Sequence, residues 1–187
     1  DAATAGFTVT AGESTILAFS LSGGTIAPGE GILTILTVDG TPTGISSIVI
    51  SDPSGAETHF TFYIFLTSLE ITGSSQLTIF SDSITTLEVG DQIGIFDANG
   101  LTNYNDCSNQ HGELVVGSAV WTGEQASPVS IGSVDMCAFG GVQLAGYIEG
   151  NLVLVKVYRP STGVEYNTEL TWDLGTGVFG EIIQSVS

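Results

Sequence analysis

Hydrophobic and polar residues alternate along almost the whole chain, and this period of two limits its fold more than any other feature. Successive side chains of a β-strand point to opposite faces, so such alternation predicts half-buried strands. Thr, Val, Ile and Phe fill most strand positions, which suits a pleated surface. The expected strands cover residues 7–10, 15–21, 31–38, 45–51, 58–66, 76–80, 91–96, 113–121, 142–147, 151–159, 164–172 and 178–183.

Turn-forming residues separate these segments, as at Gly23-Gly24 and Asn99-Gly100. No window keeps the period of an amphipathic helix. Short strands with regular turns predict an all-β fold, an antiparallel β-sandwich or jelly roll. A Thr-Gly-Ser-Ser stretch at residues 72–75 is typical of a hinge or hairpin loop. We therefore expect two β lobes, residues 1–70 and 71–187, with one continuous domain as the alternative.

The charge of the chain is strongly unbalanced. Asp and Glu number 20 against two cations, Lys156 and Arg159, and the formal net charge is −18. Two cations cannot hold a phosphate backbone, which argues against nucleic acid as a partner. No apolar run reaches the roughly 20 residues needed to cross a bilayer, so no membrane insertion is expected. The start at Asp1, without Met or a signal-like segment, is typical of a processed or excised chain.

The first third of the chain contains a strand–loop–strand motif. The segment "LAFS" at residues 17–20 is followed by a Pro-Gly loop at 26–31 and a Gly-hydrophobic-Leu strand at 32–38. This pattern resembles the C-terminal half of cohesin-like β-sandwich domains. The earlier strands of that family, rich in "D-hydrophobic-x-G-F-Q-F", are absent from this sequence. The resemblance therefore implies a partial β-sandwich in residues 1–70.

The remaining residues, 71–187, carry a second resemblance. The stretches are "LEVGDQIGIFDANG", "DCSNQHGELVVGSAVW", "CAFGGVQLAGYIEGN" and "VKVYRPSTGVEYNTEL". They resemble an uncharacterised β module of large secreted surface proteins of marine and gliding bacteria. The resemblance implies an extracellular or cell-surface location beside adhesive and carbohydrate-binding segments. It implies no particular activity.

Two cysteines, Cys107 and Cys137, suggest a disulfide in a chain of exported character. A bridge would close a loop of about 30 residues and stabilise the fold by about 3 kcal/mol on the chain-entropy model. The alternative is a pair of free thiols. A reactive thiol needs electropositive surroundings, which this acidic chain scarcely provides.

The loop "DANGLTNYNDCSN" is a candidate calcium site. Five oxygen-bearing side chains lie within ten residues: Asp97, Asn99, Asn103, Asn105 and Asp106. Ca²⁺ takes six to eight oxygen ligands, which a loop rich in Asp and Asn can supply. The loop lacks the glutamate and the flanking helices of an EF-hand. The alternative is a surface loop in which Asp and Asn side chains bond their own backbone.

Carboxylates are plentiful, but no motif for an enzyme is present. Glu165 and Glu169 lie four residues apart on one expected strand, hence on one face, where a solvated surface is the simpler interpretation than a glycosidase pair. Tyr158 and Tyr166 flank the "RPSTG" turn and can meet across it as a sugar-stacking platform, with strand packing as the alternative. We expect no catalysis by this chain.

These features favour an extracellular structural subunit that assembles with copies of itself into a filament or surface layer, with calcium in support. Missing cohesin-like strands would leave an open apolar edge, which a neighbouring chain can complete by strand addition. The expected donor is residues 2–10, with Phe7 and Val9 on one face as anchors. The alternative is a carbohydrate-binding or adhesive module of a larger secreted protein, with polysaccharide as its partner.

Overall fold

The computed structural model describes residues 2, 4–12, 15–27, 33–34, 49–56, 64–65, 67 and 69–187. The chain divides into two compact units, Asp1–Thr61 and Phe62–Ser187, which are treated separately below. The expected all-β class is confirmed, because the regular elements of the described residues are β-strands apart from one short 3₁₀ turn. The expected strands at 31–38, 45–51 and 58–66 lie mostly outside the described residues.

The described part of the first unit contains one β-hairpin. Strands β1 (Thr8–Ala11) and β2 (Ile16–Phe19) pair antiparallel, with Val9 opposite Ala18. Their expected alternation is present, since Phe7 and Val9 are half-buried while Thr8 and Thr10 are exposed.

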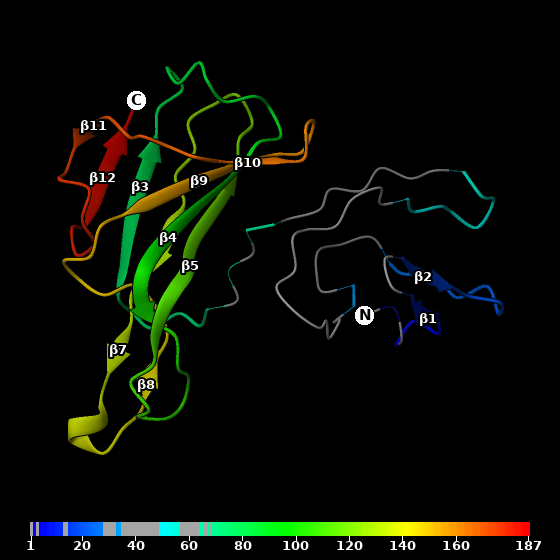
Figure 1. Cartoon of the computed structure of the whole chain (residues 1–187), viewed down its shortest axis with the longest axis horizontal. Coiled ribbons are helices and arrows are strands. Elements are labelled where there is room, and N and C mark those ends of the chain that lie inside the picture. Colours follow the sequence, from blue (N-terminus) through cyan, green and yellow to red (C-terminus); the bar gives the residue numbers. More distant parts are fainter. Residues whose placement is uncertain are drawn as a thin grey trace. The chain divides into compact units, whose positions relative to one another are not determined.

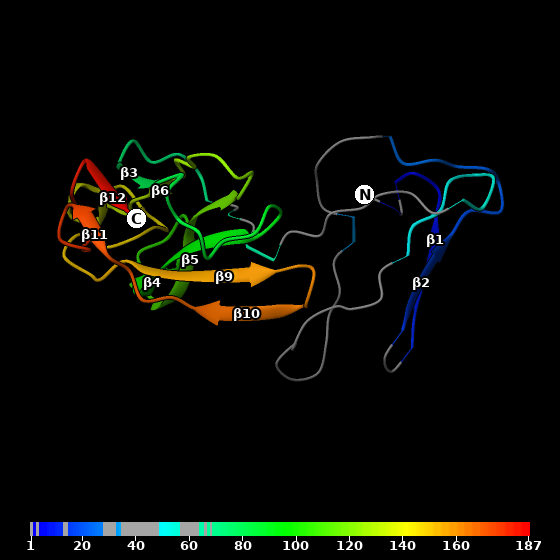
Figure 2. The ribbon, with the colours of Figure 1, turned by 90° about the horizontal axis from the view of Figure 1, so that it is seen from above.

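The second unit is built from two four-stranded sheets (Figure 1). The first has the order β10-β9-β4-β5 and the second the order β11-β12-β3-β6. The strands are β3 (Ser75–Phe80), β4 (Gln92–Leu101), β5 (His111–Val120), β6 (Val129–Ile131), β9 (Leu154–Arg159), β10 (Val164–Asn167), β11 (Trp172–Leu174) and β12 (Ile183–Val186). Figure 2 shows β9 and β10 running side by side in opposite directions.

The two sheets enclose one hydrophobic core. Ile93, Ile95 and Val155 come from the first sheet, and Phe80 and Val186 from the second. All five are buried, as expected where the apolar faces of two sheets meet. The ring of Tyr147 stacks on that of Phe179, with 4.5 Å between the centroids. This two-layer arrangement is the predicted β-sandwich.

One pairing in the second sheet departs from the antiparallel expectation. Strand β12 runs parallel to β3, and Val186 lies opposite Phe80. The chain reaches β12 from β3 through the whole first sheet, so no hairpin fixes the direction of this pairing. The strand also begins later than the expected residues 178–183. Gly175, Gly177 and Gly180 have positive φ values, which form turns before the strand can start.

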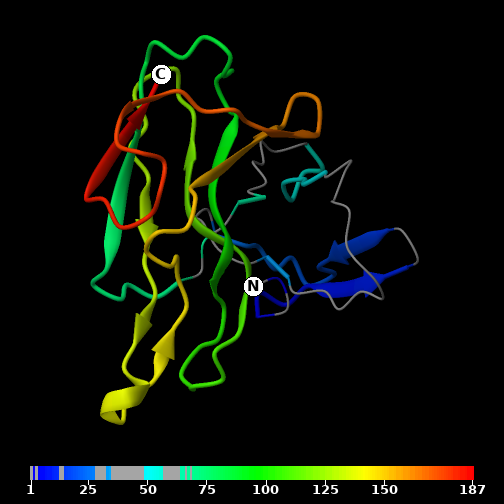
Figure 3. The same cartoon turned by 60° about the vertical axis from the view of Figure 1, so that its left-hand side comes forward.

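A smaller hairpin projects from the end of the sandwich (Figures 1 and 3). Strand β7 (Val134–Asp135) pairs antiparallel with β8 (Gln143–Leu144), and the 3₁₀ turn η1 (Cys137–Phe139) connects them. Alternation did not predict β6 or β7, because strands of two or three residues are too short to show a period.

Candidate functional site

The predicted disulfide between Cys107 and Cys137 is confirmed. Cys107 lies in the loop between β4 and β5, while Cys137 is the first residue of η1. The bond ties together residues 102–110 and 134–144, which we call the arm. Figures 1 and 3 show this arm extending beyond the two sheets.

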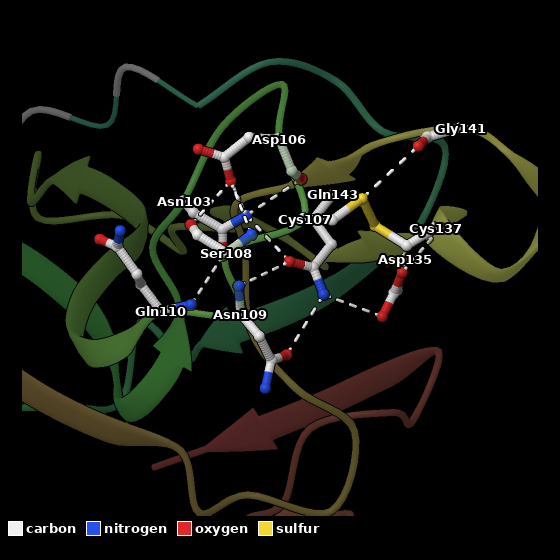
Figure 4. Close-up of a disulfide and its surroundings, with 10 residues drawn as sticks. All are labelled: Asn103, Asp106, Cys107, Ser108, Asn109, Gln110, Asp135, Cys137, Gly141 and Gln143. Carbon is white, nitrogen blue, oxygen red and sulfur yellow. Dashed lines mark hydrogen bonds between the residues drawn. A yellow bond between two sulfur atoms is a disulfide. The ribbon is translucent and has the colours of Figure 1, made fainter.

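Gln143 lies beside the disulfide and joins both halves of the arm (Figure 4). Its Oε1 accepts hydrogen bonds from Asn103 Nδ2 at 2.9 Å and from the backbone N–H of Asn109 at 3.0 Å. Its Nε2 donates to Asn109 Oδ1 at 3.2 Å and to Asp135 Oδ2 at 2.9 Å. The buried amide thus uses both of its donors and its acceptor oxygen twice. Such a satisfied network holds the arm in one conformation.

Two carboxylates of the arm are stabilised in their charged form. Asp106 Oδ1 accepts from the backbone N–H of Ser108 at 3.0 Å and from its hydroxyl at 2.7 Å, which lowers the pKa of Asp106. The backbone N–H of Cys137 donates to Asp135 Oδ1 at 2.9 Å and lowers the pKa of Asp135. Their stabilising contribution is complete above the ordinary Asp pKa of about 3.9. It is lost as the pH falls through the lower pKa of the folded state.

Asp97 and Asn99 belong to a different network. Asp97 is buried, and its Oδ2 accepts from the backbone N–H of Ile148 at 2.9 Å. Asn151 Nδ2 donates to both carboxylate oxygens of Asp97, at 2.9 and 3.0 Å. The backbone N–H of Asn99 donates to Asp97 Oδ1 at 2.9 Å. N–H donors therefore surround this carboxylate.

The five candidate calcium ligands are thus divided between two networks. Asn103 and Asp106 bond each other in the arm at 2.8 Å, whereas Asp97 and the backbone carbonyl oxygen of Asn99 accept bonds from the segment before β9. Asn105 has a positive φ of 57°, as in the tight turns that Asn tolerates. Within the described part of the chain, no three His, Cys, Asp or Glu side chains are grouped to hold a metal ion. Calcium binding by this loop stays a prediction.

The end of the arm exposes apolar side chains. Residues 136–142, which we call the tip, include Met136, Phe139 and Val142, and Phe139 is 83% exposed. The 3₁₀ turn buries none of its residues. The sequence from 136 to 148 carries no charge, although the chain as a whole is at −18. A rigid, uncharged, apolar projection is suited to contact with another surface.

The two candidate stacking tyrosines lie on opposite faces of their hairpin. Tyr158 is opposite Glu165, whereas Tyr166 is opposite Val157. Side chains on neighbouring positions of a strand alternate between faces, so the expectation that these rings meet across the turn is wrong. The Tyr166 ring instead lies 5.6 Å from the Arg159 guanidinium. Sugar binding by either ring alone stays a prediction.

Glu165 and Glu169 do not share a strand face. Glu165 lies in β10, which ends at Asn167, and Glu169 follows in the connection to β11. Lys156 Nζ lies 2.8 Å from Glu113 and 3.9 Å from Glu165. Glu165 therefore lies beside Lys156 at the surface of the sheet, on a different element from Glu169.

Reasoning from the sequence identified the cysteines of the arm but missed two residues that hold its halves together. Gln143 and Asp135 were not singled out, because their role depends on the pairing of β7 with β8. The uncharged run that contains Phe139 is a signal that could have identified the tip.

No protein-family model, curated protein or solved structure matches this chain. Across the described residues, no helix is both long enough and apolar enough to span a membrane.

Proposed function

We propose that this chain is an extracellular structural module that associates with copies of itself by β-strand addition, forming a filament or surface layer. The observation that supports this most is the β1–β2 hairpin, whose outer edges have no strand partner among the described residues. An isolated two-stranded hairpin is marginally stable in water, so further pairing stabilises it. The disulfide is consistent with an oxidising environment outside the cell.

The hydrogen-bonding pattern of the hairpin shows which backbone N–H groups point outward, away from the partner strand. The Gly12 N–H donates to the Thr15 carbonyl oxygen at 2.8 Å. Hydrogen-bonded pairs recur at every second residue of an antiparallel ladder, so Thr10 with Leu17 and Thr8 with Phe19 are hydrogen-bonded pairs as well. In the register of β1 with β2, Thr8 and Thr10 therefore face β2 with their N–H groups. Val9 N–H points away from β2, and Ala18 N–H points away from β1.

Exposed apolar residues give a further reason for association. Leu17 is 58% exposed and Ile16 is 40% exposed in β2. Pairing at the outer edge of β1 would satisfy open backbone groups, and a neighbouring copy packed over the hairpin would also cover these side chains. Donation of an edge to a different surface of the next copy is heterologous and gives open filaments unless the rotation closes. Calcium support for such an assembly stays a prediction.

Val9→Pro is expected to abolish self-association, because proline has no N–H to donate across the outer edge of β1. Ala18→Pro is the matched control, because it removes the outward N–H of β2 in the same residue pair and leaves the outer edge of β1 intact. Sedimentation velocity and negative-stain microscopy measure the assembly, and amide exchange at Thr8 and Thr10 checks the hairpin. Assembly that survives Val9→Pro would exclude β1 as the donor edge. A wild-type chain that stays monomeric would exclude the proposed function.

The tip favours a second candidate function, an adhesive or carbohydrate-binding module. A preorganised apolar anchor loses little entropy on binding, and aromatic residues are common at the centre of binding surfaces. Phe139→Ser is expected to weaken retention on a polysaccharide gel or an apolar surface at least tenfold. Ile182→Ser is the control, because Ile182 is 87% exposed outside the tip. Equal retention of both variants and the wild type would argue against this function.

A further inference from the structure

The interior face of the second sheet carries a patch of four polar side chains. Gln76 and Thr78 lie on β3, opposite Ser130 of β6 and Gln184 of β12, respectively. Gln76 and Thr78 lie on the same face of β3 as Phe80, which belongs to the hydrophobic core. Each of the four residues is at most 1% exposed. Side chains directly opposite each other on one face lie close enough for water to bridge their polar atoms.

The orientation of each glutamine amide is set by its bonds to the segment before β12. Gln76 Oε1 accepts from the backbone N–H of Gly180 at 2.9 Å and of Glu181 at 3.1 Å. Gln184 Nε2 donates to the Val178 carbonyl oxygen. Exchanging the N and O atoms of either amide would break these bonds. Gln76 therefore presents its Nε2 group to the interior, and Gln184 presents its Oε1 atom.

Four buried polar atoms of this patch have no hydrogen-bond partner among the residues that the structure describes. They are Gln76 Nε2, Thr78 Oγ1, Ser130 Oγ and Gln184 Oε1. A buried polar atom without a hydrogen bond is costly, and such atoms are rare in native proteins. Four on one interior face are not explained by packing alone.

We infer that this patch is a binding site for ordered internal water. Water both donates and accepts hydrogen bonds, so it can serve the amide donor, the amide acceptor and the two hydroxyls of this patch. Water accepts from Gln76 Nε2 and donates to Gln184 Oε1, while Thr78 and Ser130 take either role. Both glutamines also hold the segment at residues 178–181, so the water completes the network that fastens this segment over the sheet.

Thr78→Val tests the site by the sign of its effect on stability. If Thr78 Oγ1 bonds water, its removal lowers the folding equilibrium constant several-fold. If the hydroxyl is an orphan, replacing it by a methyl group of similar shape raises that constant. Thr168→Val supplies the reference for a satisfied hydroxyl, since Thr168 Oγ1 donates to the Val155 carbonyl oxygen at 2.8 Å.

A measurement on the wild-type chain makes the test independent of any variant. NMR cross-relaxation between water and the Gln76 side-chain amide protons is expected, with the sign that marks long-lived water. Absence of this signal would overturn the inference, as would a gain in stability for both Thr78→Val and Ser130→Ala. Neither result would bear on self-association through β1.

Discussion

Replacing Arg159 by Met is expected to lower the melting temperature by on the order of 10 °C, the range for a broken buried ion pair. Asp91, its partner, is 1% exposed. Arg159 Nη2 and Nε donate to the Asp91 carboxylate at 2.8 and 3.1 Å. With Met in place of the guanidinium, a carboxylate stays buried without a cation, and desolvation then opposes folding.

Arg159 also fastens the loop before β4. Its Nη2 donates to the Thr86 carbonyl oxygen at 2.9 Å, and its Nη1 lies 3.0 Å from Glu88. The hydrogen bonds and charge of Asp91 raise the pKa of Arg159, so the guanidinium stays charged. Loss of the guanidinium therefore frees this loop as well as the buried carboxylate.

Lys156 provides the matched control, because it is the other cation of the chain. Its partner Glu113 has a side chain that is 53% exposed, so water replaces the lost contact. Exposed pairs contribute little, and Lys156→Met is expected to change the melting temperature by no more than a few degrees. Thermal unfolding followed by circular dichroism compares the variants. Equal losses would show that burial of Asp91 does not set the contribution of this pair.

The sequence predicted those parts of the fold that depend on local pattern. Alternation located β3, β4, β5 and β9 to within a few residues, and the cysteine count predicted the disulfide. Predicting these features requires only a two-residue period of hydrophobicity or the presence of two cysteines. The apolar alternation of Phe7 and Val9 is likewise a local property.

Features that depend on long-range register were not predictable. The ion pair of Asp91 with Arg159 joins residues 68 positions apart, across the pairing of β4 with β9. The parallel direction of β12 and the role of Gln143 also depend on which strands become neighbours. The Asp/Asn loop was predicted to form one calcium site because its residues are close in sequence. In the structure, Asp97 lies within the extended strand β4 and bonds the Ile148 N–H, whereas Asn103 and Asp106 lie in the loop that follows this strand.

Replacing both cysteines, Cys107→Ser with Cys137→Ser, is expected to lower the free energy of unfolding by between about 3 and 4 kcal/mol. The bond spans 30 residues of sequence, and the chain-entropy model gives this range for such a loop. Urea unfolding in the absence of reductant measures the loss. Because the bond restricts the unfolded chain, the midpoint is expected to fall, and the slope m is expected to rise as the unfolded state expands.

In the folded protein, loss of the disulfide is expected to affect the arm, whose two halves are joined by the hydrogen bonds of Gln143. Without the disulfide, hydrogen bonds such as those of Gln143 to Asn103, Asn109 and Asp135 must hold the two halves of the arm together, so the arm is expected to open locally before the sheets unfold. Amide exchange should therefore accelerate at the Asn105 and Gln143 N–H groups, which bond across the arm at 3.0 and 2.9 Å, while exchange in β4 follows global stability. Reductant should reproduce both effects in the wild type and add nothing to the double variant. Unchanged exchange in the arm would mean that the hydrogen bonds, rather than the disulfide, hold the tip in place.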